Sequence, residues 1–279
     1  MNVVSYFNGM NCGMLALDKA EIKVDNYYSY EIDKYANMVS QKNYPNTKQM
    51  GSVVDADLTI LPKIDLMIGG SPCQGFSFAG KQLNFEDERS KLFFDFVKAK
   101  DFLKPKYFLL ENVKMKKESQ DIISKYLGCE PKEIWSSKFL PHNRKRLYWT
   151  NINFEEPTQV DWNINDFYEG EGFPSSGTLH KNPRRVELRR KEIFNTMTAT
   201  MYKGINASGR PAVSLRESFY YDDRDAHRML TPNECEGLQG VPKDYTDCVS
   251  NTQRYKMLGN GWTVDVIAHI FKGMSKPTE

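Results

Sequence analysis

Short apolar runs alternate with helix-like segments along the first half of the chain. Buried strands are predicted at residues 2–7, 26–30, 64–68 and 106–110, and the end of a further strand at residues 51–54. Helices are predicted between them, where apolar positions recur at helical spacing in residues 14–17, 33–39 and 92–97. Strands that alternate with helices in this way are joined by right-handed crossovers and build a mainly parallel sheet. The hydrophobic pattern therefore predicts an α/β fold.

The pattern changes at residue 153. From there to residue 227, proline and glycine break the sequence into short pieces with little helical periodicity. Within this stretch, residues 197–202 favour a strand and residues 204–210 a loop. We therefore expect a small, loop-rich second domain at residues 153–254, and a main domain formed by residues 1–152 plus 255–279.

Regular structure returns near the C-terminus. Thr231 and Glu234 have the spacing of a capping box, with a proline at the first helical position between them, and they predict a helix at residues 231–240. A glycine turn at residues 258–261 then leads into an apolar helix at residues 264–271.

The composition is typical of a soluble globular protein of 279 residues, with 40% hydrophobic residues and a mean hydropathy of −0.60. The sequence lacks the apolar run of about 18 residues that a membrane span requires, and its first residues read as a strand instead of a signal sequence. The five cysteines are odd in number and form no C-x-x-C pair. They favour a reducing compartment and argue against a disulfide framework, and with four scattered histidines we expect no metal site.

The net charge is only +2, from 38 Lys and Arg against 36 Asp and Glu, so the overall balance does not indicate a nucleic-acid partner. Basic side chains nevertheless cluster at Arg144, Lys145 and Arg146, and again at Arg184, Arg185, Arg189 and Arg190. Such clusters make the phosphate contacts of nucleic-acid-binding proteins, although a solvated helix face has the same composition.

Cys73 is the first candidate for chemistry. It follows the predicted strand at residues 64–68, in a turn rich in glycine and proline that presents it at the carboxyl edge of the sheet. Open α/β folds bind their ligands at that edge. A thiol is partly ionised near neutral pH and is intrinsically nucleophilic. The alternative is a small hydrophobic residue buried in a tight turn.

A strand, a glycine turn and a helix follow one another in residues 2–17. In such a unit the backbone N–H groups approach a polar ligand closely, so residues 8–13 are a candidate cofactor loop. Glu31 ends the next strand, about 20 residues further on, where a carboxylate commonly binds ribose hydroxyls in dinucleotide folds. A surface carboxylate at a helix start is the alternative reading of Glu31.

Glu111 and Asn112 close the apolar strand at residues 106–110 and form a second candidate. The ends of neighbouring parallel strands meet at one edge, so Glu111 is expected near Cys73. A charge in such a place must be paired, although a structural cap has the same position. Arg144 and Arg146 share one face if their segment is extended, and we expect that face at the same edge.

In their order along the chain, these features resemble the motifs of the cytosine-C5 DNA methyltransferases. The resemblance rests above all on Pro72-Cys73-Gln74, Glu111-Asn112-Val113 and Arg144-Lys145-Arg146, and it covers the whole chain except most of residues 153–195. It implies a Rossmann-like, S-adenosylmethionine-dependent methyltransferase fold with a small, loop-rich target recognition domain. The segments at residues 6–10, 148–151 and 259–262 look closer to the phage-type or eukaryotic de novo-like branch than to the common restriction-system enzymes.

The resemblance also implies which residues bind S-adenosylmethionine. Phe7 would lie against the adenine, residues 9–13 beside the methionine part, and Glu31 on the ribose. The implied pocket consists of Phe7, Gly9, Asn11, Cys12, Gly13, Glu31, Ile32, Ser52, Val53, Pro72, Leu92, Asn260, Trp262 and Val264. Ser52 departs from the family, which has an aspartate there to bind the adenine amino group, so Asp55 or a backbone carbonyl would substitute.

The implied reaction transfers a methyl group to C5 of cytosine in duplex DNA. Cys73 would add to C6, Glu111 would act as the general acid at N3, and Arg144 and Arg146 would hold O2. The target atom is inaccessible inside a duplex, so the base would be flipped out of the stack. The residues implied for DNA contacts are Gln74, Gly75, Ser77, Asn112, Thr198, Arg189, Arg190 and Arg228.

Two other functions fit the same fold. One is a transfer-RNA cytosine-C5 methyltransferase, although Gly75-Phe76-Ser77 is typical of the DNA type. The other is a non-catalytic DNA-binding paralogue, which generally lacks the Pro-Cys pair or the Glu-Asn-Val run, and both are present here. For the enzyme we expect a monomer in the cytoplasm of a bacterium or phage-infected cell, associated with the nucleoid, with a cognate restriction endonuclease as a candidate partner.

Overall fold

The structure is a computed structural model of the chain and forms two compact units. It describes residues 1–71, 88–170, 173–179, 186–190, 192–203, 211–214, 218–220 and 227–275. The first unit consists of Met1–Ile134, Lys145–Glu156 and Ile267–Glu279, and the second of Trp135–Arg144 and Pro157–Val266. The division into a cofactor-binding domain and a target recognition domain stays a prediction.

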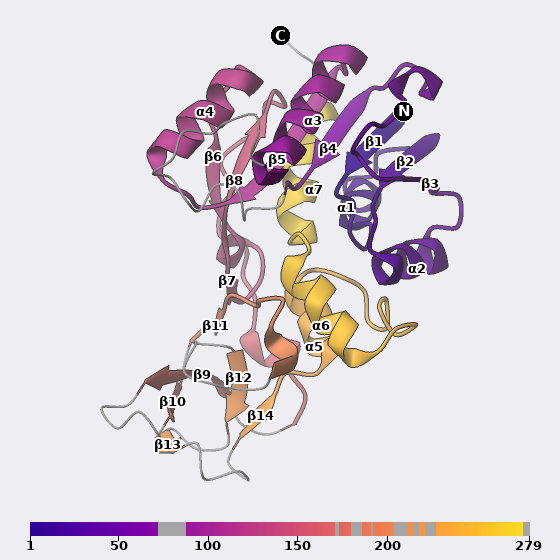
Figure 1. Ribbon diagram of the computed structural model, residues 1–279. Coiled ribbons are helices and arrows are strands. Elements are labelled where there is room, and N and C mark those ends of the chain that lie inside the picture. The colour runs from indigo at the N-terminus through magenta and orange to yellow at the C-terminus, as the bar shows by residue number, and fades with distance from the viewer. Residues whose placement is uncertain are drawn as a thin grey trace. The chain divides into compact units, whose positions relative to one another are not determined.

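Within the described residues, the first unit is built on a seven-stranded sheet of order β3-β2-β1-β4-β5-β8-β6 (Figure 1). The strands are β1 (Asn2–Tyr6), β2 (Asn26–Tyr30), β3 (Lys48–Gly51), β4 (Leu66–Gly69), β5 (Tyr107–Val113), β6 (Lys132–Trp135) and β8 (Lys145–Thr150). Neighbours from β3 to β5 pair in parallel, whereas β8 pairs antiparallel with β5. The mainly parallel sheet expected from the alternating pattern is confirmed.

Helices follow the strands of this sheet in the order predicted. They are α1 (Cys12–Lys19), α2 (Lys34–Asn43), α3 (Glu88–Leu103) and α4 (Lys117–Leu127). Local chemistry sets their ends: Asp33 Oδ1 accepts a hydrogen bond from the Tyr35 N–H (2.9 Å) and caps α2. Gly128 follows α4 in a left-handed conformation, with a φ of 74° that glycine adopts without strain.

The core of the first unit packs apolar strand residues against the helices. Val4, Met67, Leu110 and Trp149 are fully buried within it. The indole N–H of Trp149 donates to Ser124 Oγ of α4 (3.0 Å), so the one polar atom of that side chain is satisfied.

The second unit contains, in its described part, a five-stranded antiparallel sheet of order β13-β10-β9-β12-β14 (Figure 1). Its strands are β9 (Phe173–Leu179), β10 (Val186–Arg190), β12 (Pro211–Ser214), β13 (Ser218–Tyr220) and β14 (His227–Met229). A separate parallel pair joins β7 (His142–Asn143) to β11 (Phe194–Asn195).

The remaining helices include α5 (Pro232–Leu238) and α6 (Asn251–Asn260) in the second unit. The helix α7 (Val264–Lys272) begins in the second unit and ends in the first. Short 3-10 helices are η1 (Leu58–Ile60), η3 (Ser136–Lys138), η4 (Ile164–Phe167), η5 (Met201–Lys203) and η7 (Gly273–Ser275). No helix in the described ranges has the length and apolarity needed to cross a membrane.

The second unit is more regular than its glycine and proline content predicted. The strand predicted at residues 197–202 is wrong, because the chain turns there through a hydrogen bond from the Met201 N–H to Thr198 O (3.1 Å). The turn predicted at residues 258–261 is also misplaced: Gly259 and Asn260 are the last residues of α6, which ends at Gly261.

The capping box predicted at the start of α5 is confirmed, and its carboxylate has further partners. Glu234 accepts hydrogen bonds from the Thr231 N–H (2.6 Å) and the Glu169 N–H (2.7 Å), and it pairs with the Arg228 guanidinium (2.7 Å). Burial alone would raise the pKa of Glu234, but these donors outweigh it and the pKa is lowered.

The lowered pKa of Glu234 predicts an acid-sensitive contribution to stability. A carboxylate whose folded pKa lies below its unfolded value stabilises the protein above the unfolded pKa, and this contribution is lost as the pH falls through the folded pKa. We expect Glu234→Gln to lower the free energy of unfolding at neutral pH by about 1–3 kcal/mol. The variant should also lose less stability than the wild type on acidification below about pH 5, because the unfolded carboxyl titrates near pH 4.3.

The measurement is urea unfolding across that pH range. Glu169→Gln is the matched control, since its side chain is 73% exposed and its ion pair with Lys243 is long, at 3.7 Å. Equal pH dependence in the wild type and Glu234→Gln would contradict the assignment.

Candidate active site

Backbone pairing at one level across the strands brings three predicted site residues and the start of the cysteine loop to the same edge of the first unit's sheet. Tyr6 of β1 pairs with Tyr30 of β2 and with Gly69 of β4, and Gly69 pairs with Leu110 of β5. The residues that follow these four are Phe7, Glu31, Gly70 and Glu111. The carboxyl ends of the parallel strands therefore gather the aromatic residue, both carboxylates and the start of the cysteine loop, as the sequence predicted.

Glu111 is held in an ion pair with Arg146. Glu111 is buried, with its side chain 10% exposed, and Arg146 Nε lies 2.9 Å from Glu111 Oε1. The pair follows from the antiparallel register, in which Glu111 lies opposite Tyr148 and Val113 opposite Arg146. Diagonal neighbours on one face of a sheet are within reach of long side chains. The structure thus brings together two of the predicted catalytic residues.

Asn112 ties β5 to the segment that leads into the cysteine. Its side-chain amide is buried and donates to Ser71 Oγ (3.1 Å) and to Ser71 O (3.3 Å). Pro72, Cys73, Gln74, Gly75 and Ser77 lie outside the described residues. Asn112, predicted to contact DNA, therefore anchors the chain two residues before Cys73.

Arg144 has a different set of partners from Arg146. It is 3% exposed and donates to the carbonyl oxygens of Met197 (3.3 Å), Gly259 (3.0 Å) and Gly261 (2.8 Å), all in the second unit. The expectation that both arginines present one face to one edge is corrected here. Arg144 lies between β7 and β8, so its guanidinium is directed by the segment that precedes the strand carrying Arg146.

The predicted cofactor loop has an unusual backbone. Phe7, Gly9 and Asn11 all have positive φ values, of 58°, 58° and 76°. Two of the three are not glycine, and such residues adopt this conformation only where the surroundings hold it in place. The Gly9 N–H donates to Glu31 Oε2 (2.8 Å), which links the loop to the carboxylate at the end of β2.

Two buried asparagines of this loop form hydrogen bonds with neighbouring segments of the first unit. Asn8 Oδ1 accepts a hydrogen bond from Tyr27 (2.9 Å), and Asn11 Nδ2 donates to Thr47 Oγ1 (3.0 Å). Asn8 Nδ2 and Asn11 Oδ1 are buried and have no hydrogen-bond partner among the residues that the structure describes. A Cβ added at Gly9 would meet nothing within 4 Å, so the loop leaves space above Gly9.

These features fit the cofactor group for which the loop was proposed. The loop offers open space at Gly9, unused polar atoms at Asn8 and Asn11, and the Glu31 carboxylate beside them. Ile32, the next residue, is 79% exposed and provides an apolar surface at the same strand end. A ligand that combines polar groups with an aromatic base would match these polar atoms and this apolar surface.

The other residues implied for the cofactor are divided between the two units. In the first unit, Cys12 and Gly13 are buried in the first turn of α1, Val53 is buried, Leu92 is partly buried, and Ser52 Oγ accepts from the Val54 N–H (3.0 Å). In the second unit, Asn260 is exposed at the end of α6, Trp262 is half-buried, and Val264 is buried at the start of α7.

The residues implied for DNA contacts also belong to the second unit, apart from Asn112 and those in the cysteine loop. Thr198 is exposed and its hydroxyl lies 3.0 Å from that of Thr200. Arg189 and Arg190 lie in β10, and their side chains are outside the described part. The guanidinium of Arg228 pairs with Glu234, so it has protein partners where phosphate contacts were expected.

Comparison with known proteins identifies the family. A family model described as C-5 cytosine-specific DNA methylase matches residues 1–171 and 142–276. The chain belongs to this family. As a member, it is a DNA cytosine-5-methyltransferase that uses S-adenosylmethionine.

Individual relatives match the methylase along its length. The type II methyltransferase M1.ScrFI of Lactococcus lactis subsp. cremoris is 29% identical over 310 residues, covering 99% of this chain and 78% of that protein. The structure of the Entamoeba histolytica methyltransferase EhMeth has a TM-score of 0.79 at 20% identity, covering 98% of this chain and 97% of that chain. The S. pombe Dnmt2 methyltransferase has a TM-score of 0.71 at 19% identity and the same coverage. These two structures show that the fold is shared.

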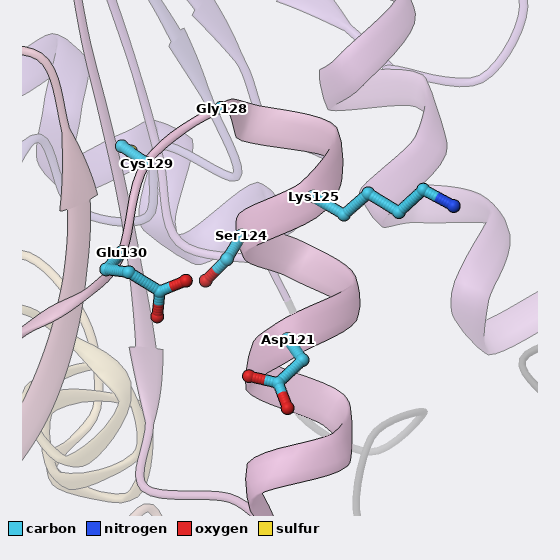
Figure 2. A pocket seen from close by; sticks show the side chains of 6 residues that line it. All are labelled: Asp121, Ser124, Lys125, Gly128, Cys129 and Glu130. Carbon is cyan, nitrogen blue, oxygen red and sulfur yellow. The ribbon is translucent and has the colours of Figure 1, made fainter.

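Two other cysteines of the methylase are poor candidates for a nucleophile. Cys129 lines a hollow of about 600 Å³ beside α4, together with Asp121, Ser124, Lys125, Gly128 and Glu130 (Figure 2). Burial raises the pKa of the Cys129 thiol, and it raises the pKa of the fully buried Cys235 thiol as well. Both are therefore less ionised at neutral pH than an ordinary cysteine, and no predicted site residue lines this hollow.

Sequence reasoning placed Asn8 in the candidate cofactor loop without predicting its burial, and it gave the buried Gln239 no role. Gln239 is fully buried, and its amide donates to Leu258 O (2.7 Å) while its Oε1 accepts from Thr263 (2.8 Å). In the sequence Gln239 stands in a Leu-Gln-Gly run, and it is the C-cap residue of α5.

The backbone of the cofactor loop generates a prediction with a matched control. Gly9 and Gly128 both have positive φ values and open space around an added Cβ, but only Gly9 lies in the predicted cofactor loop. We expect Gly9→Ala and Gly128→Ala each to lose about 1–2 kcal/mol of stability, the cost of a left-handed alanine. Only Gly9→Ala should weaken S-adenosylmethionine binding, by about tenfold.

Isothermal titration calorimetry without DNA measures the affinity, and thermal unfolding measures the stability. Equal cofactor affinity in the two variants would show that Gly9 does not contribute to cofactor binding.

Proposed function

We propose that the methylase transfers a methyl group from S-adenosylmethionine to C5 of cytosine in duplex DNA, through a covalent Cys73 adduct on a flipped base. The observation that carries this proposal is the buried Glu111–Arg146 pair at the carboxyl end of β5. The neighbouring Asn112 anchors Ser71, two residues before Cys73. An acid, a hydrogen-bond donor and the approach to a thiol therefore adjoin one another in the first unit.

Cys73 supplies the nucleophile. Cytosine C5 is too weak a nucleophile to take a methyl group directly, so electron density must first be driven into the ring. The Cys73 thiolate adds to C6, the C5–C6 double bond opens, and N3 takes up a proton. C5 of the resulting adduct is then electron-rich.

In the reacting complex Glu111 is protonated and delivers this proton to N3, while Arg146 donates to O2 of the base. Because the Arg146 guanidinium lies 2.9 Å from Glu111, the two groups can meet adjacent atoms of one pyrimidine edge. A preorganised donor aimed at developing charge is worth a factor of about 10²–10³ in rate. We assign O2 to Arg146 alone, since the Arg144 guanidinium donates to three backbone carbonyls.

S-adenosylmethionine supplies an electrophilic methyl group bound to a sulfonium. Phe7, the loop around Gly9 and the Glu31 carboxylate would hold that cofactor, Phe7 through its aromatic ring and Glu31 through hydrogen bonds to hydroxyls. After the new bond forms at C5, a base removes the C5 proton, the C6–sulfur bond breaks, and the thiolate and the N3 proton return to Cys73 and Glu111.

Base flipping follows from the burial of the reacting atoms. C6 and N3 are enclosed by stacking and pairing in a duplex, so Cys73 and Glu111 reach them only if the base leaves the helix. Unstacking costs a few kcal/mol, which contacts from the second unit and from the cysteine loop offset. Thr198 and Arg189 are proposed to contribute to those contacts.

The remaining proposals concern the setting of the reaction. Relatives of the chain are named as type II methyltransferases, which supports a role in restriction and modification with a cognate endonuclease as partner. We propose that the methylase acts as a monomer in the cytoplasm.

The main alternative substrate is RNA, because the same cysteine and carboxylate chemistry acts on cytosine in either polymer. The fold is similar to that of the S. pombe Dnmt2 methyltransferase, and for this reason RNA is included in the test. We expect labelled S-adenosylmethionine to transfer its methyl group to duplex DNA and not to transfer RNA. Label found only in RNA would refute the DNA proposal, and bisulfite sequencing of DNA from expressing cells would then show no methylated site.

Cys73→Ala is expected to abolish methyl transfer while leaving cofactor affinity nearly unchanged, because the thiol acts on the base and not on the cofactor. Cys129→Ala is the matched control and should retain full activity. Duplex DNA with 5-fluorocytosine at the target position should trap the wild type as a covalent complex, since fluorine cannot leave as a proton does.

Denaturing electrophoresis detects that complex. A complex formed equally by Cys73→Ala, or activity that persists in that variant, would show that another residue is the nucleophile.

A further inference from the structure

Arg144 is a buried cation that donates hydrogen bonds to three backbone carbonyls. Nη1 donates to Met197 O (3.3 Å) and Gly259 O (3.0 Å), and Nη2 donates to Gly261 O (2.8 Å). A guanidinium can serve several acceptors at once because its donors are fixed in a planar fork. Arg144 therefore holds two segments that are distant in sequence, at Met197 and at the end of α6.

Gln239 binds the same end of α6 from a second direction. Its amide donates to Leu258 O (2.7 Å), and its backbone carbonyl accepts from the Val264 N–H (2.9 Å). Thr263 donates to Gln239 Oε1 (2.8 Å) and orients that amide. Gln239 and Thr263 are both buried, so these bonds are shielded from water.

Steric contact adds a third constraint. A Cβ at Gly259 would lie 2.1 Å from the backbone carbon of Thr198, so only glycine allows the two backbones to meet. We use the term carbonyl clasp for Arg144, Gln239 and the carbonyls that they bind at Met197, Leu258, Gly259 and Gly261.

The clasped segments carry residues to which the proposed function gives two different tasks. Asn260 and Trp262 are implied for the cofactor, and each adjoins a carbonyl bound by Arg144. Thr198 is implied for DNA and follows Met197, the third carbonyl bound by Arg144. Arg144 is therefore a single side chain that connects a cofactor segment with a recognition segment inside the second unit.

We infer that Arg144 and Gln239 are positioning residues that hold Asn260 and Trp262 in place for the cofactor and in register with Thr198. This inference rests on the proposed function. It also assigns Arg144 a role distinct from that of Arg146, which contacts the carboxylate of Glu111.

The test compares Arg144→Lys with Arg146→Lys. Lysine keeps the charge, but its compact ammonium cannot reproduce the planar fork that serves three carbonyls. We expect Arg144→Lys to raise the Kd and the KM for S-adenosylmethionine by about tenfold, with kcat at saturating cofactor within about twofold of the wild type. Arg146→Lys should lower kcat by about 100-fold and leave the cofactor Kd unchanged.

Thr263→Val is a second, milder variant that keeps the shape of the side chain and removes the donor that orients Gln239. It should raise the cofactor Kd by a smaller factor than Arg144→Lys and leave kcat unchanged. Calorimetry without DNA gives the Kd, steady-state methyl transfer gives kcat and KM, and thermal unfolding sets an assay temperature at which every variant is folded.

Two results would overturn the inference. If Arg144→Lys lowers kcat and leaves the cofactor Kd unchanged, Arg144 acts on the base as Arg146 does. If the variants lose only thermal stability, the clasp is structural and does not position the cofactor segment. A wild-type protein that binds no S-adenosylmethionine would instead refute the proposed function on which the inference rests.

Discussion

The register of the parallel strands is the constraint on which the first unit depends. Tyr30, Tyr6, Gly69 and Leu110 lie in one row across β2, β1, β4 and β5, so the next residue of each strand emerges at the same height. A slip of one residue in any of these strands would turn its side chains to the opposite face. Gly69 also keeps the row compact, because a Cβ there would come within 2.8 Å of the Phe96 ring. The positions of the predicted site residues therefore depend on the backbone register of these strands.

The antiparallel strand β8 brings a cation to the carboxylate at the end of β5. It runs back along β5 and places Arg146 diagonally from Glu111, so an acid and a cation from distant parts of the chain meet on one face. Arg144 lies two positions earlier, where the chain leaves the second unit, and its guanidinium is engaged there. Two arginines that read as one motif in the sequence therefore act in different surroundings.

Local signals explain what the sequence predicted well. The apolar run of β4 and the capping box of Thr231 and Glu234 depend on neighbours in sequence, and both are found. The convergence of Phe7 and Glu111 was also predicted, because parallel strands end at a common edge. The sequence could not show the partners of Arg144, since these carbonyls belong to residues 53 to 117 positions further along the chain. The sheet of the second unit was missed because its strands are short and polar. The cysteine at the centre of the predicted chemistry lies outside the described residues, so its role rests on the sequence and on its anchored neighbour Ser71.

The path of α7 has a consequence for the order in which the protein can fold. The second unit is inserted between segments of the first, and α7 carries the chain back from the second unit to the first. Ile267, Ile270 and Phe271 of this helix are fully buried, and Gly273 packs directly against the backbone of Asn153. During synthesis, every strand of the first sheet leaves the ribosome before this helix exists. The core of the first unit is therefore complete only after the second unit has been synthesised.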